Sequence, residues 1–226
     1  MKRLFVIFVV ALMILSVHGQ THYEGNMAVG AKAGVTLSRL RFNPSVPQTM
    51  LMGAMAGVAF RYMEEKHFGL IVELNMEQRG WKETFDGYDL HYQRRLTYLQ
   101  LPVMSHIYFG SNRFRGFFNA GPEIGLMIGE STKANFDYSR VWELQDFPTA
   151  NRSVEQFDLP VEHKFDYGIS AGVGMEFIAR NRSSFQLEGR FYYGLNDVFG
   201  NHKSDAFSGS SSMSIMITLG YYYRIK

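Results

Sequence analysis

The chain contains no cysteine among its 226 residues. That absence excludes a disulfide framework, a thiolate metal site and a lipid-modified N-terminal cysteine. After residue 20 the chain also lacks any apolar run long enough to cross a bilayer as a helix, which needs about 20 consecutive residues. The remaining chain is therefore either a soluble protein or a membrane protein that crosses with β-strands.

The N-terminus carries the features of an export signal. Lys2 and Arg3 form a basic start, and residues 4–17 follow as a run of 14 residues without charge. This run is too short to span a bilayer as a helix, and it ends shortly before a small residue, Gly19. We therefore predict a secretory signal peptide that is cleaved between Gly19 and Gln20.

Cleavage would leave 226 − 19 = 207 residues, which suits a signal peptide at 1–19 and one domain at 20–226. Loss of Lys2 and Arg3 lowers the formal net charge from +2 to 0. A chain without net positive charge offers no general attraction for polyanions, so no nucleic-acid partner is expected.

Residues 165–177, FDYGISAGVGMEF, alternate strictly in polarity. The odd-numbered positions are all apolar, whereas the even-numbered positions are small or acidic. A period of two residues over this length indicates a β-strand with one apolar face and one polar face. The polar face holds three glycines together with Asp166 and Glu176.

The same alternation recurs in about eight segments, as is typical of outer-membrane barrels. These segments are 27–37, 52–62, 68–76, 98–109, 117–128, 165–177, 185–195 and 213–225. Tight polar connections alternate with long ones, and Asp86-Gly87 within one long connection is a hairpin signal. We predict an all-β fold, a closed antiparallel up-and-down transmembrane β-barrel of about eight strands. It should lie in the outer membrane of a Gram-negative bacterium, with both termini in the periplasm.

The polar faces of these strands carry charged residues of both signs. The interior of a barrel of about eight strands is filled by side chains, so these charges must pair with one another. The predicted lumen charge network comprises Lys32, Arg61, Glu73, Glu77, Glu123, Asp166, Glu176, Glu188, Arg190 and Arg224.

If the centre of a tight turn is assumed, the residues that face each other across the two joined strands can be predicted. These pairings set glycines opposite large charged residues, which would let the network fit a narrow lumen. A turn centred near Asn181 sets Gly172 opposite Arg190, and Gly174 opposite Glu188 in the same way. A turn centred near Glu65 sets glycines opposite two further carboxylates: Gly57 opposite Glu73 and Gly53 opposite Glu77. Pro102 and Pro122 interrupt two strands, and we expect a local bulge at each.

Three further runs carry a resemblance to a known family. The runs are YLQLP at 98–102, NAGP at 119–122 and FDYG with AGVGME between 165 and 176. They are similar to the Bacteroidetes outer-membrane β-barrel family often labelled PorT-like. The resemblance covers most of the chain after the signal and implies an outer-membrane barrel of about eight strands. The secretion role linked to the named PorT protein is not implied, because no motif here is specific to it.

An outer-membrane barrel would be surrounded by outer-membrane lipid. Its expected partners during biogenesis are the barrel-assembly machinery and periplasmic chaperones. Other envelope proteins are further partner candidates. One departure concerns assembly: such barrels usually end in an aromatic residue, whereas this chain ends in Lys226.

Catalytic and metal-binding patterns are weak. Ser105 and His106 are adjacent on a predicted strand and point to opposite faces, so they cannot act as a pair. A solvated loop is the simpler interpretation of Asp158, Glu162 and His163, which lack ligand spacing. We therefore expect no enzyme activity, no cofactor and no metal.

The connection 129–164 is the best candidate for recognition, since long loops on rigid scaffolds commonly bind partners. The alternative is a loop that folds over the mouth and packs its aromatic residues on itself. Its aromatic residues are Phe136, Tyr138, Trp142, Phe147 and Phe157. Three functions stay open: a structural or partner-binding barrel, a narrow porin-like channel or ligand-binding barrel, and a lipid-modifying enzyme.

Overall fold

The computed structural model describes residues 25–65, 67–144, 147–148, 153–179, 182–199 and 207–225. The predicted signal peptide and its cleavage site at Gly19 and Gln20 lie outside these residues. The strands are β1 (Asn26–Asn43), β2 (Gln48–Thr49), β3 (Leu51–Met63), β4 (Phe68–Glu83), β5 (Tyr92–Gly110), β6 (Phe114–Ala134), β7 (Phe165–Ile178), β8 (Ser183–Asp197) and β9 (Gly209–Arg224). Two short 3-10 helices, η1 (Tyr138–Glu143) and η2 (Glu155–Phe157), lie between β6 and β7.

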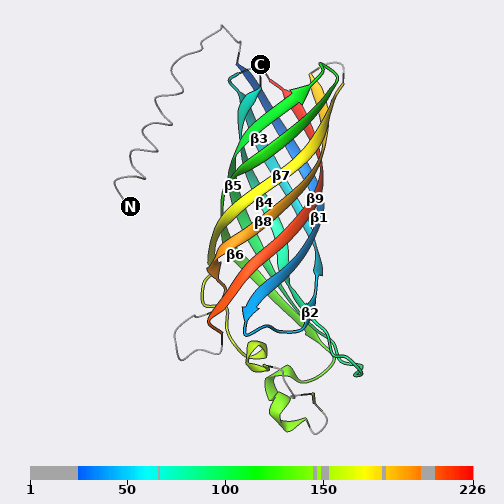
Figure 1. Ribbon diagram of the computed structural model, residues 1–226, viewed down its shortest axis with the longest axis vertical. Helices are drawn as coiled ribbons and strands as arrows, with labels where there is room; N and C mark the ends of the chain where they lie inside the picture. Colours follow the sequence, from blue (N-terminus) through cyan, green and yellow to red (C-terminus); the bar gives the residue numbers. More distant parts are fainter. Residues whose placement is uncertain are drawn as a thin grey trace, which may run out of the picture.

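Eight of these strands form a closed antiparallel ring. The sheet order is β4-β3-β1-β9-β8-β7-β6-β5, and a further pairing of β4 with β5 closes it. The two-residue strand β2 lies outside the ring, beside the end of β4. Figure 1 shows the tilted strands of the resulting barrel. The prediction of an up-and-down barrel of about eight strands is confirmed.

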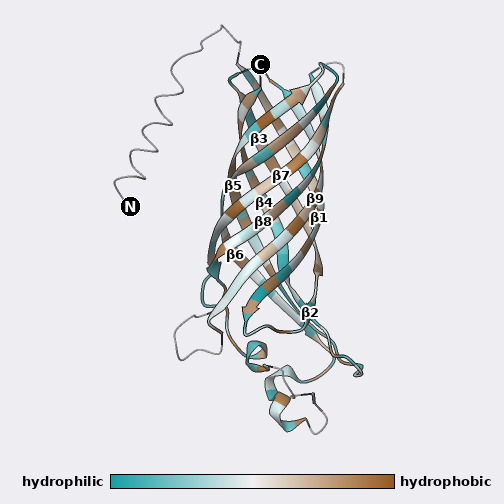
Figure 2. Cartoon of the chain, viewed as in Figure 1, coloured by the Kyte–Doolittle hydropathy of each residue, from teal (hydrophilic) through white to brown (hydrophobic). Residues whose placement is uncertain are grey.

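The wall has an apolar outer face and a polar inner face. Outward-facing Val173 and Leu219 are 62% and 68% exposed, whereas inward-facing Glu73 is 1% exposed. Figure 2 shows the alternation as brown and pale or teal bands along each strand. An apolar outer surface suits hydrocarbon, and the closed ring leaves no free sheet edge in the wall. Within the described residues, no helix has the length and hydrophobicity that a membrane crossing requires.

The two ends of the barrel differ. The described C-terminus and the start of β1 lie at the end that carries the short turns (Figure 1). At the other end several strands run past the predicted segments, and β6 continues to Ala134. The predicted hairpin at Asp86-Gly87 is confirmed: Gly87 has φ of +81°, and Tyr88 N donates to Phe85 O at 3.1 Å. In outer-membrane barrels short turns face the periplasm and long loops the outside, so we name the two ends of the barrel periplasmic and extracellular accordingly.

The predicted register of β7 with β8 is confirmed. Gly172 lies opposite Arg190, and Gly174 lies opposite Glu188. A side chain at position 172 would collide with this arrangement, since an added Cβ would lie 2.8 Å from Glu188 Oε1. Gly172 thus leaves room for the charged residues of β8, whereas a side chain at Gly174 would collide with the ring of Phe117.

The predicted register of β3 with β4 is wrong by two residues. Glu73 lies opposite Ala59 rather than Gly57, and Glu77 lies opposite Met55 rather than Gly53. The cause is the turn, which is centred one residue later than assumed, as the pairing of Met63 with Gly69 shows. A shift of two residues keeps every side chain on its face.

The expected bulges at Pro102 and Pro122 are also wrong. The β4–β5 ladder passes from Val72–Val103 to Asn75–Gln100 without a change of register, leaving the positions around Pro102 unpaired. The β5–β6 ladder is interrupted in the same way beside Pro122. The missing proline N–H therefore interrupts the hydrogen bonding between neighbouring strands, but neither strand gains the extra residue of a bulge. The register shift of β5 against β6 lies elsewhere, between Thr97 and Tyr98.

Candidate functional site

The centre of the lumen is occupied by a buried ion-pair cluster from four strands. Arg190 of β8 binds Glu73 of β4 through two contacts, Nη1 to Oε2 at 2.8 Å and Nη2 to Oε1 at 2.9 Å. Lys32 Nζ of β1 lies 2.6 Å from Glu73 Oε1 and 3.4 Å from Glu188 Oε2. Asn119 of β6 donates to Glu188 Oε1 at 2.9 Å. The two parallel hydrogen bonds between the Arg190 guanidinium and the Glu73 carboxylate are a strong, charge-assisted pair.

The Arg190–Glu73 pair crosses the lumen, because β8 and β4 stand four positions apart in a ring of eight. Glu188, two residues away on the same face of β8, also contacts Arg190, at 2.9 Å. Strand periodicity fixes which face a side chain occupies, but not which opposite wall it can reach.

The periplasmic half of the lumen holds a second pair. Arg61 Nη1 lies 2.8 Å from Glu176 Oε1, and its guanidinium lies 4.9 Å from the centre of the Tyr222 ring. His106 is fully buried beside them and shares a 2.7 Å hydrogen bond between Nδ1 and Asn119 Oδ1. This half of the lumen is therefore occupied by buried charged, polar and aromatic side chains.

The extracellular half is built around Arg79. Its guanidinium lies between the rings of Tyr98 and Tyr192, at 4.4 and 4.3 Å from their centres. It also lies 3.5 Å from Glu77 Oε2 and 3.3 Å from Asp166 Oδ2. Cation–π contacts and ion pairs together hold this charge away from water.

Two predicted members of the network stand apart from these pairs. Glu123 is buried and accepts a 2.5 Å hydrogen bond from Ser170 Oγ. Arg224 is half-buried at the last position of β9. Within the described residues it has no carboxylate within 4.0 Å, so its predicted membership of the network is wrong. At the periplasmic rim water can solvate its charge, and no buried partner is required.

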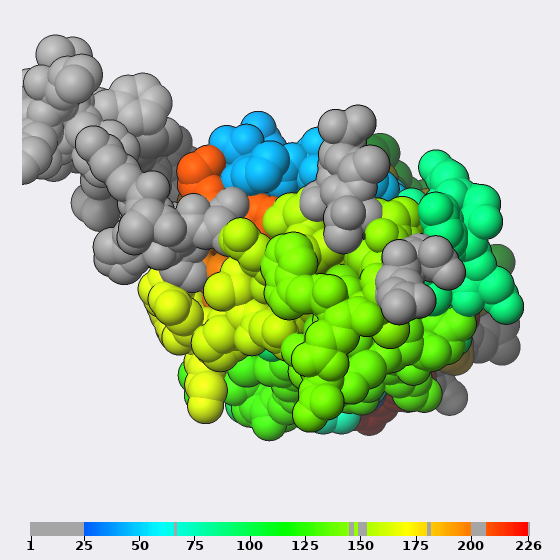
Figure 3. Space-filling model, turned by 90° about the horizontal axis from the view of Figure 1, so that it is seen from below, coloured from blue at the N-terminus to red at the C-terminus, as the bar shows by residue number. Residues whose placement is uncertain are grey.

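Above the lumen, an aromatic cap closes the extracellular mouth. It is the largest group of mutually packed buried apolar residues, and it draws on β1, β4, β5 and the long loops. Its buried members are Leu40, Phe42, Val46, Trp81, Phe85, Tyr92, Leu96, Tyr98, Val141, Phe147, Val154, Phe157, Val198, Phe199 and Phe207. Figure 3, seen from the extracellular side, shows the segment after β6 in yellow-green across the centre of the molecule.

The loop between β6 and β7 supplies one side of this cap. Phe157 packs against Tyr92 with ring centres 4.6 Å apart, and Phe147 packs against Phe85 at 5.7 Å. Phe136 contacts both Phe147 and Phe157. Phe147 and Phe157 are buried in the cap and Phe136 is half-buried against it, which is the arrangement of the alternative interpretation, a loop that packs its aromatic residues over the mouth.

Arg94 ties the same loop to the wall. It donates through Nη1 to Leu159 O at 2.7 Å and through Nε to Glu130 Oε1 at 2.7 Å. Its guanidinium also lies 5.6 Å from the rings of Trp81 and Phe199. The loop is therefore fixed over the mouth by a charged residue as well as by aromatic packing.

The remaining two loop aromatics lie on η1 at the outer surface. Trp142 is 70% exposed, whereas Tyr138 is half-buried with its ring 5.8 Å from that of Tyr92. Asp137 caps η1, accepting hydrogen bonds from the Ser139 hydroxyl at 2.7 Å and backbone N–H at 3.2 Å. These bonds lower the pKa of the Asp137 carboxyl. Trp142 is thus presented on an ordered turn.

The other candidate groups do not assemble. Ser105 is half-exposed on the outer face, whereas His106 is buried in the lumen. His163 Nδ1 lies 3.0 Å from Asp197 O. Across the described part of the chain, no three His, Cys, Asp or Glu side chains group in a way that could hold a metal ion.

We compared the sequence and the structure with those of known proteins. The model of the family described as outer membrane protein beta-barrel domain matches residues 19–200. No curated protein matches the chain.

Solved structures are similar at low identity. Neisserial surface protein A is 9% identical with a TM-score of 0.45, over 89% of this chain and 99% of that one. Ail of Yersinia pestis, solved with the heparin analogue sucrose octasulfate, is 11% identical with a TM-score of 0.42, over 89% and 100%. OprG of Pseudomonas aeruginosa is 11% identical with a TM-score of 0.49, over 88% and 95%. The family match spans well over half of the sequence, so this chain belongs to the outer membrane protein β-barrel domain family and resides in the Gram-negative outer membrane.

Proposed function

We propose that this protein is a non-conducting, non-enzymatic barrel that serves the outer membrane as a structural or partner-binding component. The observation that carries the proposal is the filled lumen beneath a closed cap. Ion pairs occupy the lumen from Arg61 to Arg79, and aromatic side chains close its extracellular end. A ring of eight strands leaves no space beyond its own side chains.

Partner binding is assigned to the outer surface of the loop between β6 and β7. Trp142 and Leu144 are exposed there, while neighbouring Val141 is buried in the cap and anchors the turn. An exposed tryptophan on a fixed turn is the kind of residue that dominates protein–protein interfaces. The partner class that fits is another protein of the cell envelope or its surroundings.

A narrower family assignment belongs to the same proposal. The runs at 98–102 and 119–122 support membership of the PorT-like group. Barrel-assembly machinery and periplasmic chaperones are the partners expected during biogenesis. No secretion role is included.

Planar-bilayer recording tests the central claim. We expect the purified barrel to show no stepwise ion conductance, and we expect the same of Phe157→Ala, which loosens the cap but leaves the lumen filled. Reproducible conductance from wild type would contradict the proposal and favour a narrow porin-like channel. Unchanged lipid composition in a deletion strain is the matching expectation against a lipid-modifying enzyme.

Native membranes provide the test of partner binding. Cross-linking should capture a protein on wild type and lose it in Trp142→Ala, with Trp81→Phe, a cap variant, as the matched control. Equal capture by wild type and Trp142→Ala would remove the loop surface from the proposal.

A further inference from the structure

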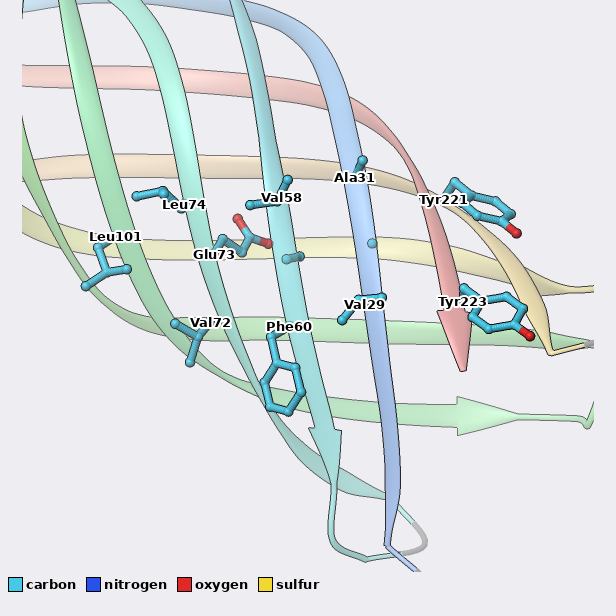
Figure 4. A pocket seen from close by; sticks show the side chains of 12 residues that line it. Val29, Ala31, Val58, Phe60, Val72, Glu73, Leu74, Leu101, Tyr221 and Tyr223 are labelled. Carbon is cyan, nitrogen blue, oxygen red and sulfur yellow. The ribbon is translucent and has the colours of Figure 1, made fainter. Parts of the chain in front are cut away.

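Two apolar hollows indent the lipid-facing wall on the periplasmic half of the barrel. The first has a volume of about 610 Å³ and lies over β9, β1, β3 and β4 (Figure 4). The second, of about 420 Å³, lies over β8, β9 and β1. Ala31 and Tyr221 line both hollows, so the two adjoin along one ridge.

The hollows arise from the order of large and small outward residues. Ala31 lies between Tyr221 of β9 and Val58 of β3, and Val29 lies between Tyr223 and Phe60 in the next row. Figure 4 shows the two tyrosines on one side of Val29 and Ala31, and Phe60 on the other. Ala31 and Val29 are shorter than the rings of Tyr221, Tyr223 and Phe60 beside them, so the outer wall is depressed at these two residues.

Tyr221 is a fixed ridge rather than a mobile side chain. Its hydroxyl shares a 3.0 Å hydrogen bond with Ser183 Oγ, and its ring packs on Phe185 with centres 5.4 Å apart. Both hollows therefore exist before any ligand binds, which reduces the entropy lost on binding.

An exposed arginine lies beside the ridge at the periplasmic end. Arg182 directly precedes Ser183 in the turn before β8, and its side chain is exposed. Its Nη1 reaches Ile225 O at 3.4 Å, just beyond the end of β9. Arg224 N donates to Arg182 O at 2.8 Å, which brings the two arginine backbones together. Guanidinium groups bind phosphate oxygens through paired hydrogen bonds.

We propose that this surface binds one diacyl phospholipid of the periplasmic leaflet. One acyl chain lies in each hollow, on either side of Tyr221, and the phosphate lies at Arg182. Two adjoining apolar hollows match the two acyl chains, and the Arg182 guanidinium matches the anionic phosphate at the polar edge. This inference does not depend on the proposed function, because it concerns the outer wall and not the loops.

Native mass spectrometry of the folded barrel tests the proposal. Wild type is reconstituted in vesicles of phosphatidylethanolamine and phosphatidylglycerol, then extracted in mild detergent. Ala31→Trp places a large side chain in both hollows, whereas Ala120→Trp places the same side chain outward on the opposite wall. Heat-modified gel migration verifies that each variant is folded.

We expect one retained phospholipid per chain for wild type and Ala120→Trp, and about tenfold less for Ala31→Trp, equivalent to about 1.4 kcal/mol. Arg182→Gln should reduce retention while leaving the hollows intact. Equal retention by wild type and Ala31→Trp would overturn the proposal, as would absence of lipid from folded wild type. A protein dimer that is lost in Ala31→Trp would overturn it too, since a second copy would then cover the hollows.

Discussion

The lumen and the cap are both closed interiors, but charged side chains fill the first and aromatic side chains fill the second. The lumen is held by ion pairs between side chains of regular strands, such as Arg190 with Glu73. The cap is held by aromatic rings from segments far apart in sequence, such as Tyr92 with Phe157. The lumen therefore depends on the integrity of the ring, whereas the cap depends on loops that can open without breaking it.

The largest expected effect is removal of the central cation. Among the described residues, Arg190→Ala leaves Lys32 as the one cation paired with the buried carboxylates of Glu73 and Glu188, and should cost about 3–5 kcal/mol of barrel stability. Urea titration in bilayers, followed by heat-modified gel migration, measures this loss.

A double-mutant cycle sharpens the assignment. Coupling of Arg190 with Glu73 should reach about 1–3 kcal/mol, whereas coupling with Glu123 should be smaller, because Glu123 bonds Ser170 and interacts with Arg190 only at longer range. Equal coupling with both carboxylates would show that the cross-lumen pair is misassigned.

The next largest effect is expected from placing a charged side chain on the lipid-facing wall. Val173 is exposed on the lipid-facing side of β7, so Val173→Arg should cost about 2–4 kcal/mol if it lies near the midplane of the bilayer. Val173→Leu is the matched control and should fold like wild type. Equal bilayer stability of the arginine and leucine variants would refute the assignment of the faces.

Loosening the cap should have a local effect. Phe157→Ala removes a ring that contacts Tyr92, Phe136 and Phe147, so hydrogen exchange and protease cleavage should rise in the loop between β6 and β7. Barrel unfolding should change by less than about 1 kcal/mol, because the lumen stays paired. A loss as large as that of Arg190→Ala would mean that cap and ring unfold as one unit.

The smallest expected effect is that of Trp142→Ala. Its side chain is largely exposed, so barrel stability should stay within about 0.5 kcal/mol of wild type. The same urea titration measures it, beside loss of the cross-linked partner. A clear loss of stability would place Trp142 in the cap rather than on the binding surface.

The sequence was sufficient to predict the strands and their faces, because a period of two is a local property. It also predicted the pairing of Gly172 with Arg190, where the turn had the assumed centre. The predicted partner of Glu73 on β3 was wrong by two residues, because the turn between β3 and β4 is centred one residue later than assumed.

The contents of the two interiors were harder to predict, for different reasons. Arg190 reaches Glu73 across the ring, and that contact depends on the tilt and closure of all eight strands. Phe147 and Trp142 come from the same loop, yet one is buried and the other exposed. Irregular segments have no periodicity that separates such residues.

The Arg190–Glu73 bridge has a consequence for the rate at which the barrel is lost. Two opposite walls can share this contact only after the pairing of β4 with β5 has closed the ring. An open, partly inserted sheet gains nothing from it, so the bridge stabilises the finished barrel without stabilising the state that leads to it. We expect the bridge to act mainly on the unfolding rate, keeping an inserted barrel in the membrane long after its assembly is complete.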